Sequence, residues 1–129
     1  MKKNGFYGFR ETGKSKLQSF ALEIEAECQL KCGNCYRSFG NAAAPMPAKF
    51  VKRIIKEAKE TGFAEIVLIG GEPTMHPLLP EFTEMILKEG LSPIICTNGI
   101  RLADKEYCKK ILLPGTTIVI HGLIPIAAK

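Results

Sequence analysis

The stretch "SFALEIEAECQLKCGNCY", residues 19–36, decides the fold because an alternating segment in it runs directly into three cysteines. Over residues 19–27 the side chains alternate strictly between two faces, with the glutamates at 23, 25 and 27 on the same face. A period of two residues predicts a β-strand. The cysteines at positions 28, 32 and 35 are therefore expected on a loop at the carboxyl end of that strand.

Downstream, helical and extended patterns alternate. Apolar residues recur at helical spacing in residues 48–61, 78–90 and 102–115, and glycines at 62 and 90 end the first two of these segments. Apolar runs at 65–71, 92–99 and 116–122 are typical of buried parallel strands. Four strands alternating with three helices predict the α/β class: a partial TIM-like (β/α) barrel of about four parallel strands with flanking helices.

Composition indicates a single globular domain. The chain has 129 residues, of which 46% are hydrophobic and 24% charged, and its formal net charge is +5. We expect residues 1–18 to be an N-terminal lead-in before one domain over residues 19–129. The lysines are spread along the chain and form no dense basic arm. Nucleic-acid binding is therefore not predicted. The sequence shows no signal peptide and no bilayer-length apolar run, which predicts a cytoplasmic protein without a membrane partner.

Polar or glycine-rich residues follow every predicted strand. The first strand leads into the cysteines, the second into "GGEP" at 70–73, the third into "TNG" at 97–99 and the fourth into His121-Gly122. Parallel strands present their carboxyl ends on one rim, and the active sites of such sheets lie there. We therefore expect these residues to form one site.

The three clustered thiols suit two kinds of metal site. A disulfide framework is disfavoured because a reducing compartment is expected. A structural zinc site is tetrahedral and needs a fourth ligand, for which the remaining histidines and cysteines are candidates: His76, Cys96, Cys108 and His121. A [4Fe–4S] cluster held by three thiolates leaves one iron open to an outside ligand. The spacing, with a single Cys-x-x-Cys pair, favours the open cluster.

The run Cys28-x3-Cys32-x2-Cys35 followed by Tyr36 resembles the signature of the radical S-adenosylmethionine (SAM) superfamily. "GGEP" resembles the second motif of that family, and "TNG" often ends its third strand. The ordered set covers residues 19–122 and is more specific than any single motif. The resemblance implies an enzyme that reductively cleaves SAM to methionine and a 5′-deoxyadenosyl radical, which abstracts hydrogen from a substrate.

The resemblance also implies roles for individual residues. Cys28, Cys32 and Cys35 would bind three irons of a [4Fe–4S] cluster, and the methionine part of SAM would chelate the fourth. Contacts to SAM are then expected from Tyr36, near the adenine, and from Gly70, Gly71, Glu72, Pro73, Thr97, Asn98 and His121. The two glycines would let backbone carbonyls approach the SAM ammonium group, and Glu72 would supply its countercharge.

Four polar residues have a structural interpretation beside the functional one. Glu23 and Glu25 either face water or line the polar lumen of an open barrel. His76 is expected to pack or hydrogen-bond within its own turn. His121 is either a contact of the cofactor or substrate or a structural histidine.

The two remaining cysteines are expected to be small core residues. Cys96 alternates with Thr97, so a cofactor-facing Thr97 would turn Cys96 toward the helices. Cys108 lies on the predicted helical stripe of its segment.

The predicted barrel is incomplete. By the resemblance, a complete radical SAM core would have six strand–helix units. A full eight-unit barrel takes about 250 residues. Three explanations stay open: a piece of a longer protein, a short form closed by self-association or by a completing chain, or a remnant that binds SAM and cluster without turnover. A zinc-binding structural module is the remaining alternative.

The expected partners follow from the resemblance. They are an electron donor such as flavodoxin or ferredoxin, and a substrate. "CQLKCGNCY" and "GGEPTMHP" look somewhat like the motifs of peptide-modifying maturases, which suggests a peptide.

Overall fold

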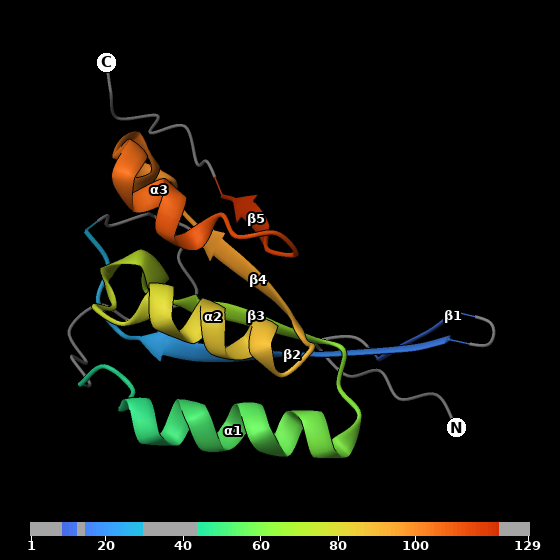
Figure 1. Ribbon diagram of the computed structural model, residues 1–129. Helices are drawn as coiled ribbons and strands as arrows, with labels where there is room; N and C mark the ends of the chain where they lie inside the picture. Colours follow the sequence, from blue (N-terminus) through green and yellow to red (C-terminus); the bar gives the residue numbers. More distant parts are fainter. Residues whose placement is uncertain (1–8, 13–14, 30–43, 122–129) are drawn as a thin grey trace.

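The structure is a computed structural model that describes residues 9–12, 15–29 and 44–121. Its elements follow one another in the order β1 (Phe9–Thr12), β2 (Ser15–Glu25), α1 (Ala48–Thr61), β3 (Glu65–Gly70), η1 (Pro73–Met75), α2 (Leu79–Lys88), β4 (Ser92–Thr97), η2 (Ile100–Ala103), α3 (Lys105–Ile111) and β5 (Thr117–Ile120) (Figure 1).

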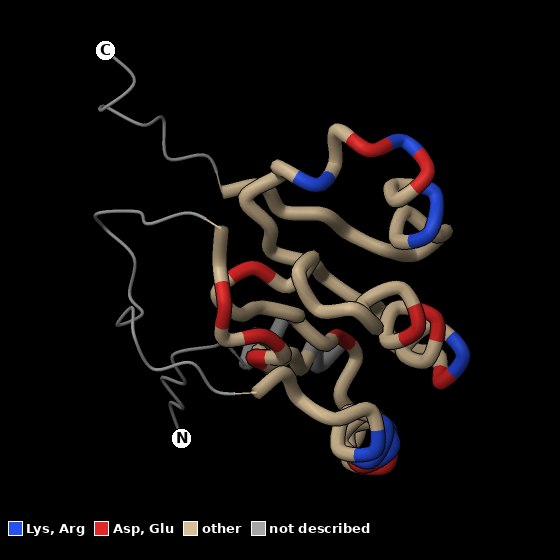
Figure 2. The backbone as a smooth tube through the Cα atoms, turned by 90° about the vertical axis from the view of Figure 1, so that its left-hand side faces the viewer, with Lys and Arg blue, Asp and Glu red and all other residues tan. Residues whose placement is uncertain are grey.

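The strands form one sheet in the order β1-β2-β3-β4-β5. Strands β2, β3, β4 and β5 are parallel, and β1 is antiparallel to the beginning of β2. The three helices lie on one side of this sheet (Figures 1 and 2). The predicted four parallel strands with flanking helices are therefore confirmed.

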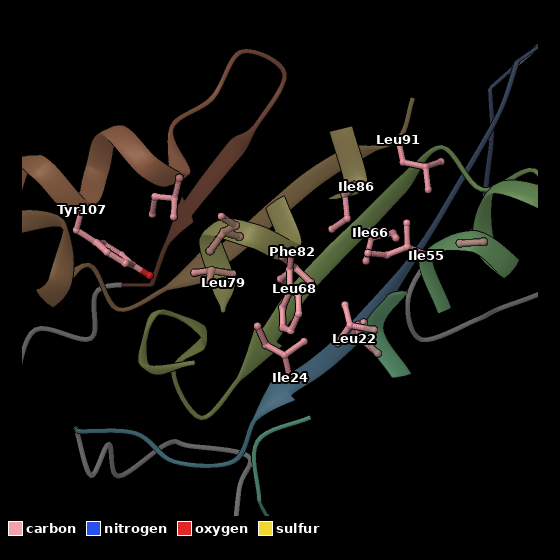
Figure 3. Packing of buried hydrophobic residues seen from close by; sticks show 14 residues of the cluster. Leu22, Ile24, Ile55, Ile66, Leu68, Leu79, Phe82, Ile86, Leu91 and Tyr107 are labelled. Atoms are coloured by element: carbon pink, nitrogen blue, oxygen red, sulfur yellow. The ribbon is translucent and has the colours of Figure 1, made fainter. Parts of the chain in front are cut away.

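The core lies between the sheet and the helices. One face of the strands contributes Leu22 and Ile24 from β2, and Ile66 and Leu68 from β3. Buried apolar side chains of α1 and α2 belong to the same cluster: Val51, Ile55, Ala58, Leu79, Phe82 and Ile86. Figure 3 shows Ile55, Leu79 and Phe82 converging on β2 and β3. Burial of one face of each strand and one stripe of each helix explains the two periodicities of the sequence.

Local signals explain where α1 ends and where α3 begins. Helix α1 ends as predicted because Gly62, at φ 94°, adopts the left-handed conformation that terminates it. Helix α3 begins later than predicted because the Asp104 carboxylate accepts hydrogen bonds from the backbone N–H groups of Glu106 and Tyr107. This N-cap starts the helix at Lys105, after the short turn η2.

The first two strands differ from the prediction. β2 begins at Ser15 and pairs with β1 through residues 15–18, so the predicted lead-in contains a β-hairpin. β2 also ends at Glu25, and its register with β3 shifts between Glu23 and Glu25. The division at residue 18 stays a prediction. None of the helices in the described part of the chain has the length and apolar character that a membrane span requires.

Two phenylalanines test the packing. Phe82 is fully buried, whereas Phe50 on α1 is 49% exposed. We expect Phe82→Ala to lower the free energy of unfolding by about 3–5 kcal/mol, because it leaves a cavity between α2 and the sheet. The matched change Phe50→Ala should alter it by less than about 0.5 kcal/mol. Urea unfolding of both variants makes the comparison, and equal losses would contradict the assigned core.

Candidate cofactor site at the strand ends

The carboxyl ends of β2, β3 and β4 lie together at one edge of the sheet. Figure 2 views the molecule from this edge and shows acidic segments near the strand ends, with most Lys and Arg segments on the outer helices. Glu25 ends β2, and Glu27 and Glu72 each follow a strand end by two residues. The site is therefore acidic in a chain whose net charge is +5.

The "GGE" segment is bonded to the chain that leads into the cysteines. The backbone N–H of Gly71 donates to the Glu25 carbonyl oxygen at 2.7 Å, and the N–H of Glu72 donates to the Glu27 carbonyl oxygen at 2.8 Å. These bonds continue the pairing of β2 with β3 beyond the ends of both strands. The position of Cys28 is thus fixed by the residues that follow β3.

Close approach of the two backbones explains why glycines stand at 70 and 71. A Cβ atom at Gly70 would lie 2.2 Å from the carbonyl oxygen of Glu25. One at Gly71 would lie 2.2 Å from the carbonyl oxygen of Glu27. Any side chain at these positions would therefore displace residues 25–27, the loop stem that leads into the cysteine loop. This steric reason is separate from the expected contact between these glycines and SAM.

The Glu72 side chain is 1% exposed and accepts four hydrogen bonds. Oε2 accepts from the backbone N–H of Thr74 at 3.1 Å, from the Thr74 hydroxyl and from the Thr97 hydroxyl at 2.6 Å. Oε1 accepts from the backbone N–H of Asn98 at 2.7 Å. Three donors converge on Oε2 and one on Oε1, so the Glu72 carboxyl group bridges the ends of β3 and β4.

A second set of contacts connects Thr74, which is bonded to Glu72, with residues of η2 and α3. The Thr74 carbonyl oxygen accepts from Nη1 of Arg101 at 2.6 Å and from the Tyr107 hydroxyl at 3.3 Å. The Arg101 guanidinium lies 3.9 Å from the centre of the Tyr107 ring. Burial raises the pKa of Tyr107 to about 12, although the nearby Arg101 charge acts in the opposite direction. The phenol therefore keeps the proton that it donates to Thr74.

Asn98 brings the end of β4 to the first cysteine. Its Nδ2 lies 3.1 Å from Oε1 of Gln29 and 3.8 Å from Sγ of Cys28. Of the three motif cysteines, only Cys28 belongs to the described residues, where it is half-buried. The other predicted residues of that loop, Cys32, Cys35 and Tyr36, lie outside the described residues.

Thr97 and Cys96 lie on the opposite faces of β4 from those expected for a cofactor-facing Thr97. Thr97 is 1% exposed and lies on the helix-covered face with Pro93 and Ile95. Cys96 was expected in the core but is half-buried on the opposite face, with Ile94. Its partial burial raises the pKa of the Cys96 thiol. β4 ends at Thr97, two residues earlier than predicted, and Asn98 is the first residue after the strand.

His76 does more than pack within its turn. It is buried, its ring is tilted against Phe82, and its Nδ1 accepts from the backbone N–H of Leu78 at 3.0 Å. Nε2 then carries the proton and donates to the carbonyl oxygen of Met46, 2.9 Å away and thirty residues earlier in the chain. Since the N–H of Met46 donates to Ile24, His76 helps to hold the segment that follows the cysteine loop.

Two of the candidates for a fourth zinc ligand have other partners in the structure. Both ring nitrogens of His76 are engaged, and the Cys108 thiol is half-buried and donates to the Leu102 carbonyl oxygen at 3.0 Å. His121 is exposed, and its backbone N–H donates to the Thr97 carbonyl oxygen at 2.9 Å. Among the described residues, no three His, Cys, Asp or Glu side chains are grouped as a metal site.

The two glutamates of β2 have different surroundings. Glu25 is 4% exposed and its Oε1 accepts from the backbone N–H of Glu27, whereas Glu23 is exposed. Both line a mostly apolar recess of about 410 Å³ between the end of β2 and the start of α1. A larger recess of about 710 Å³ lies between α2 and α3 and is not lined by Cys28 or Glu72, so size alone does not locate the site.

The glycine contact provides a test of the loop stem. We expect Gly71→Ala to destabilise the fold and to displace residues 25–27, because the new Cβ would overlap the Glu27 carbonyl group. Gly62→Ala is the matched control: it strains a residue at φ 94° but meets no atom within 4 Å. Iron and sulfide content after reconstitution should fall for Gly71→Ala and stay at the wild-type level for Gly62→Ala. Equal content in both variants would contradict the steric argument.

The contact between His76 and Met46 provides a second test. His76→Phe keeps a ring beside Phe82 but removes both hydrogen bonds, so we expect a loss of about 1–3 kcal/mol in unfolding free energy. Amide exchange at Met46 should also accelerate. The control His121→Phe changes an exposed side chain and should cost less than about 0.5 kcal/mol. Unchanged exchange at Met46 in His76→Phe would show that the bond does not hold this segment.

Comparison with known proteins agrees with this geometry. The family model described as the radical SAM superfamily matches residues 23–123. A probable GTP 3′,8-cyclase of Methanococcus maripaludis is 35% identical over an alignment of 99 residues, which covers 74% of this chain and 33% of that protein. The Fe-coproporphyrin III synthase of Methanosarcina barkeri is 32% identical over 111 residues, covering 82% of this chain and 27% of that protein.

A solved structure is similar in fold. Streptococcus suis SuiB, in crystal structures bound to its precursor peptide SuiA and to S-adenosylmethionine, superimposes with a TM-score of 0.71 at 25% identity. The match covers 81% of this chain and 24% of SuiB. The chain thus spans about a third or less of the length of these relatives. With the family model covering most of the sequence and the motifs meeting at one edge of a parallel sheet, the chain belongs to the radical SAM superfamily.

Proposed function

We propose that this chain forms the part of a radical SAM enzyme that binds the [4Fe–4S] cluster and the methionine end of SAM. When bound, the cluster supplies the electron that cleaves SAM to methionine and a 5′-deoxyadenosyl radical, which takes a hydrogen atom from the substrate. One observation carries the proposal: the residues after β3 and β4 contact the chain that enters the cysteine loop. Separate turns with ordinary structural roles would not need these mutual contacts.

Cys28, Cys32 and Cys35 are the proposed cluster ligands. In support, the Cys28 sulfur is half-buried beside an amide donor, which suits a thiolate that carries negative charge. A closed zinc site is the weaker alternative because the His76 and Cys108 side chains already have other partners.

Gly70, Gly71, Glu72 and Pro73 are the proposed site for the methionine end of SAM. Glu72 is buried and its carboxyl group is held in place by donors from η1 and from the end of β4, so we assign it the role of a countercharge to the SAM ammonium group. The backbone carbonyls of the two glycines are the proposed direct contacts. Thr97 supports the contacts indirectly, through its bond to Glu72.

Further contacts are proposed beside the methionine end. Asn98 lies next to the Cys28 sulfur, and the exposed His121 side chain follows the carboxyl end of β5. We propose both as residues beside bound SAM, with Tyr36 near its adenine.

The substrate that we propose to test first is a peptide, because SuiB was crystallised with a precursor peptide. A nucleotide is the second choice, because one relative is named a GTP cyclase. The proposed reductant is a flavodoxin or a ferredoxin, and the proposed location is the cytoplasm, where thiols stay reduced. The remaining strands of a barrel would come from a longer protein of which this chain is a piece, from self-association or from a completing chain.

Anaerobic reconstitution with iron and sulfide tests the proposal. We expect an absorbing cluster near 400 nm in the wild-type chain, and its loss in Cys28→Ala, Cys32→Ala and Cys35→Ala, since each removes one ligand. Cys108→Ala is the matched control and should retain the cluster, because its thiol only bonds to Leu102. Reduction with dithionite in the presence of SAM should then release 5′-deoxyadenosine, measured by mass spectrometry.

The outcomes separate the alternatives. A colourless protein that copurifies with zinc would refute the proposed cluster. A cluster that binds SAM without releasing 5′-deoxyadenosine would identify a binding unit without turnover in this chain alone. Cluster retention in Cys28→Ala would refute that ligand assignment.

A further inference from the structure

The side chain of Asn98 lies between two elements of the site that are far apart in sequence. It follows β4, and its Nδ2 reaches Cys28 Sγ at 3.8 Å and Gln29 Oε1 at 3.1 Å, both in the chain after β2. A distance of 3.8 Å from nitrogen to the larger sulfur atom is within the range of an N–H···S hydrogen bond. One carboxamide has two N–H groups, so both contacts can exist together.

The orientation of this amide is fixed by its other bonds. Asn98 Oδ1 accepts from the backbone N–H of Ile100 at 3.1 Å, and the Asn98 backbone N–H donates to Glu72 at 2.7 Å. Because Oδ1 is held by a donor on one side, the NH2 group must point to the other side, where Cys28 and Gln29 lie. The assignment of oxygen and nitrogen thus follows from the partners.

We infer that Asn98 tunes the reduction potential of the cluster by donating a hydrogen bond to the Cys28 thiolate. This inference rests on the proposed function, in which Cys28 binds iron. Reduction adds negative charge to a cluster and its thiolates, and an N–H dipole directed at a sulfur stabilises the reduced state more than the oxidised state. The bond therefore raises the potential, and its loss lowers it.

The arrangement gives Glu72 a part in this tuning. Glu72 accepts the backbone N–H of Asn98 and so holds the residue in the position from which its side chain reaches the sulfur. Residues around a metal ligand commonly orient it and adjust its electronic properties in this way. Asn98 is accordingly a positioning and tuning residue, in addition to any contact that it makes with SAM.

A redox titration of the reconstituted chain without SAM, followed by the EPR signal of the reduced cluster, tests the inference. Asn98→Leu keeps the approximate size and removes both N–H groups. Asn98→Asp keeps an acceptor for the Ile100 N–H and also removes them. The control Thr97→Val removes both bonds of the Thr97 hydroxyl in the same turn, to Glu72 and from the Gly99 N–H, but changes no atom of the Asn98 side chain.

We expect midpoint potentials more negative than wild type for both Asn98 variants, and an unchanged potential for Thr97→Val. A wild-type potential in Asn98→Leu overturns the inference. If that variant does not assemble a cluster, a wild-type or higher potential in Asn98→Asp overturns it instead. An equal shift in Thr97→Val also overturns it, because general distortion of the turn would then be the cause. Failure of the wild-type chain to form a cluster is a separate result that refutes the proposed function.

Discussion

The rest of the site depends on the buried carboxylate of Glu72. A charge that is 1% exposed is costly unless its hydrogen-bonding capacity is filled, and here the donors come from both η1 and the end of β4. These bonds therefore stabilise one arrangement of the turn after β3 relative to the turn after β4. Arg101 and Tyr107 extend this constraint to α3 through the Thr74 carbonyl group.

The cysteine loop is held at both of its described ends by neighbouring strand ends. The entering segment pairs with Gly71 and Glu72, where the absence of side chains at 70 and 71 lets the two backbones approach. The returning segment is bonded at Met46 by Ile24 and His76. The structure thus holds both described segments that flank residues 30–43, and functional sites commonly depend on such support from neighbouring elements.

Some of the predicted site residues stabilise the fold around the site, whereas Asn98 is directed at the cysteine. Thr97 and His76 were candidates for contact with a cofactor or metal, yet their side chains are buried and bonded to other parts of the protein. Asn98, one residue after Thr97, has its amide directed at the Cys28 sulfur. Residues next to each other in one motif thus take different parts, and the redox tuning inferred for Asn98 follows from that difference.

The sequence by itself determined the order of the elements, the parallel sheet and the strand ends at which the site lies. Apolar periodicity and the terminating Gly62 are local signals, so α1 could be predicted to the residue. The motif residues could likewise be named, because their spacing and order are written in the chain. The hairpin before residue 19 was missed because its pairing depends on a partner strand rather than on a strong apolar alternation.

Only the tertiary structure decided what each motif residue contacts. The bond from His76 to Met46 joins residues thirty apart, and the contact from Asn98 to Cys28 joins residues seventy apart. Glycines 70 and 71 likewise owe their steric role to the backbone of β2. Local sequence records which groups can donate or accept hydrogen bonds. The pairing of those groups is set by strand register and helix packing, which depend on the whole folded chain.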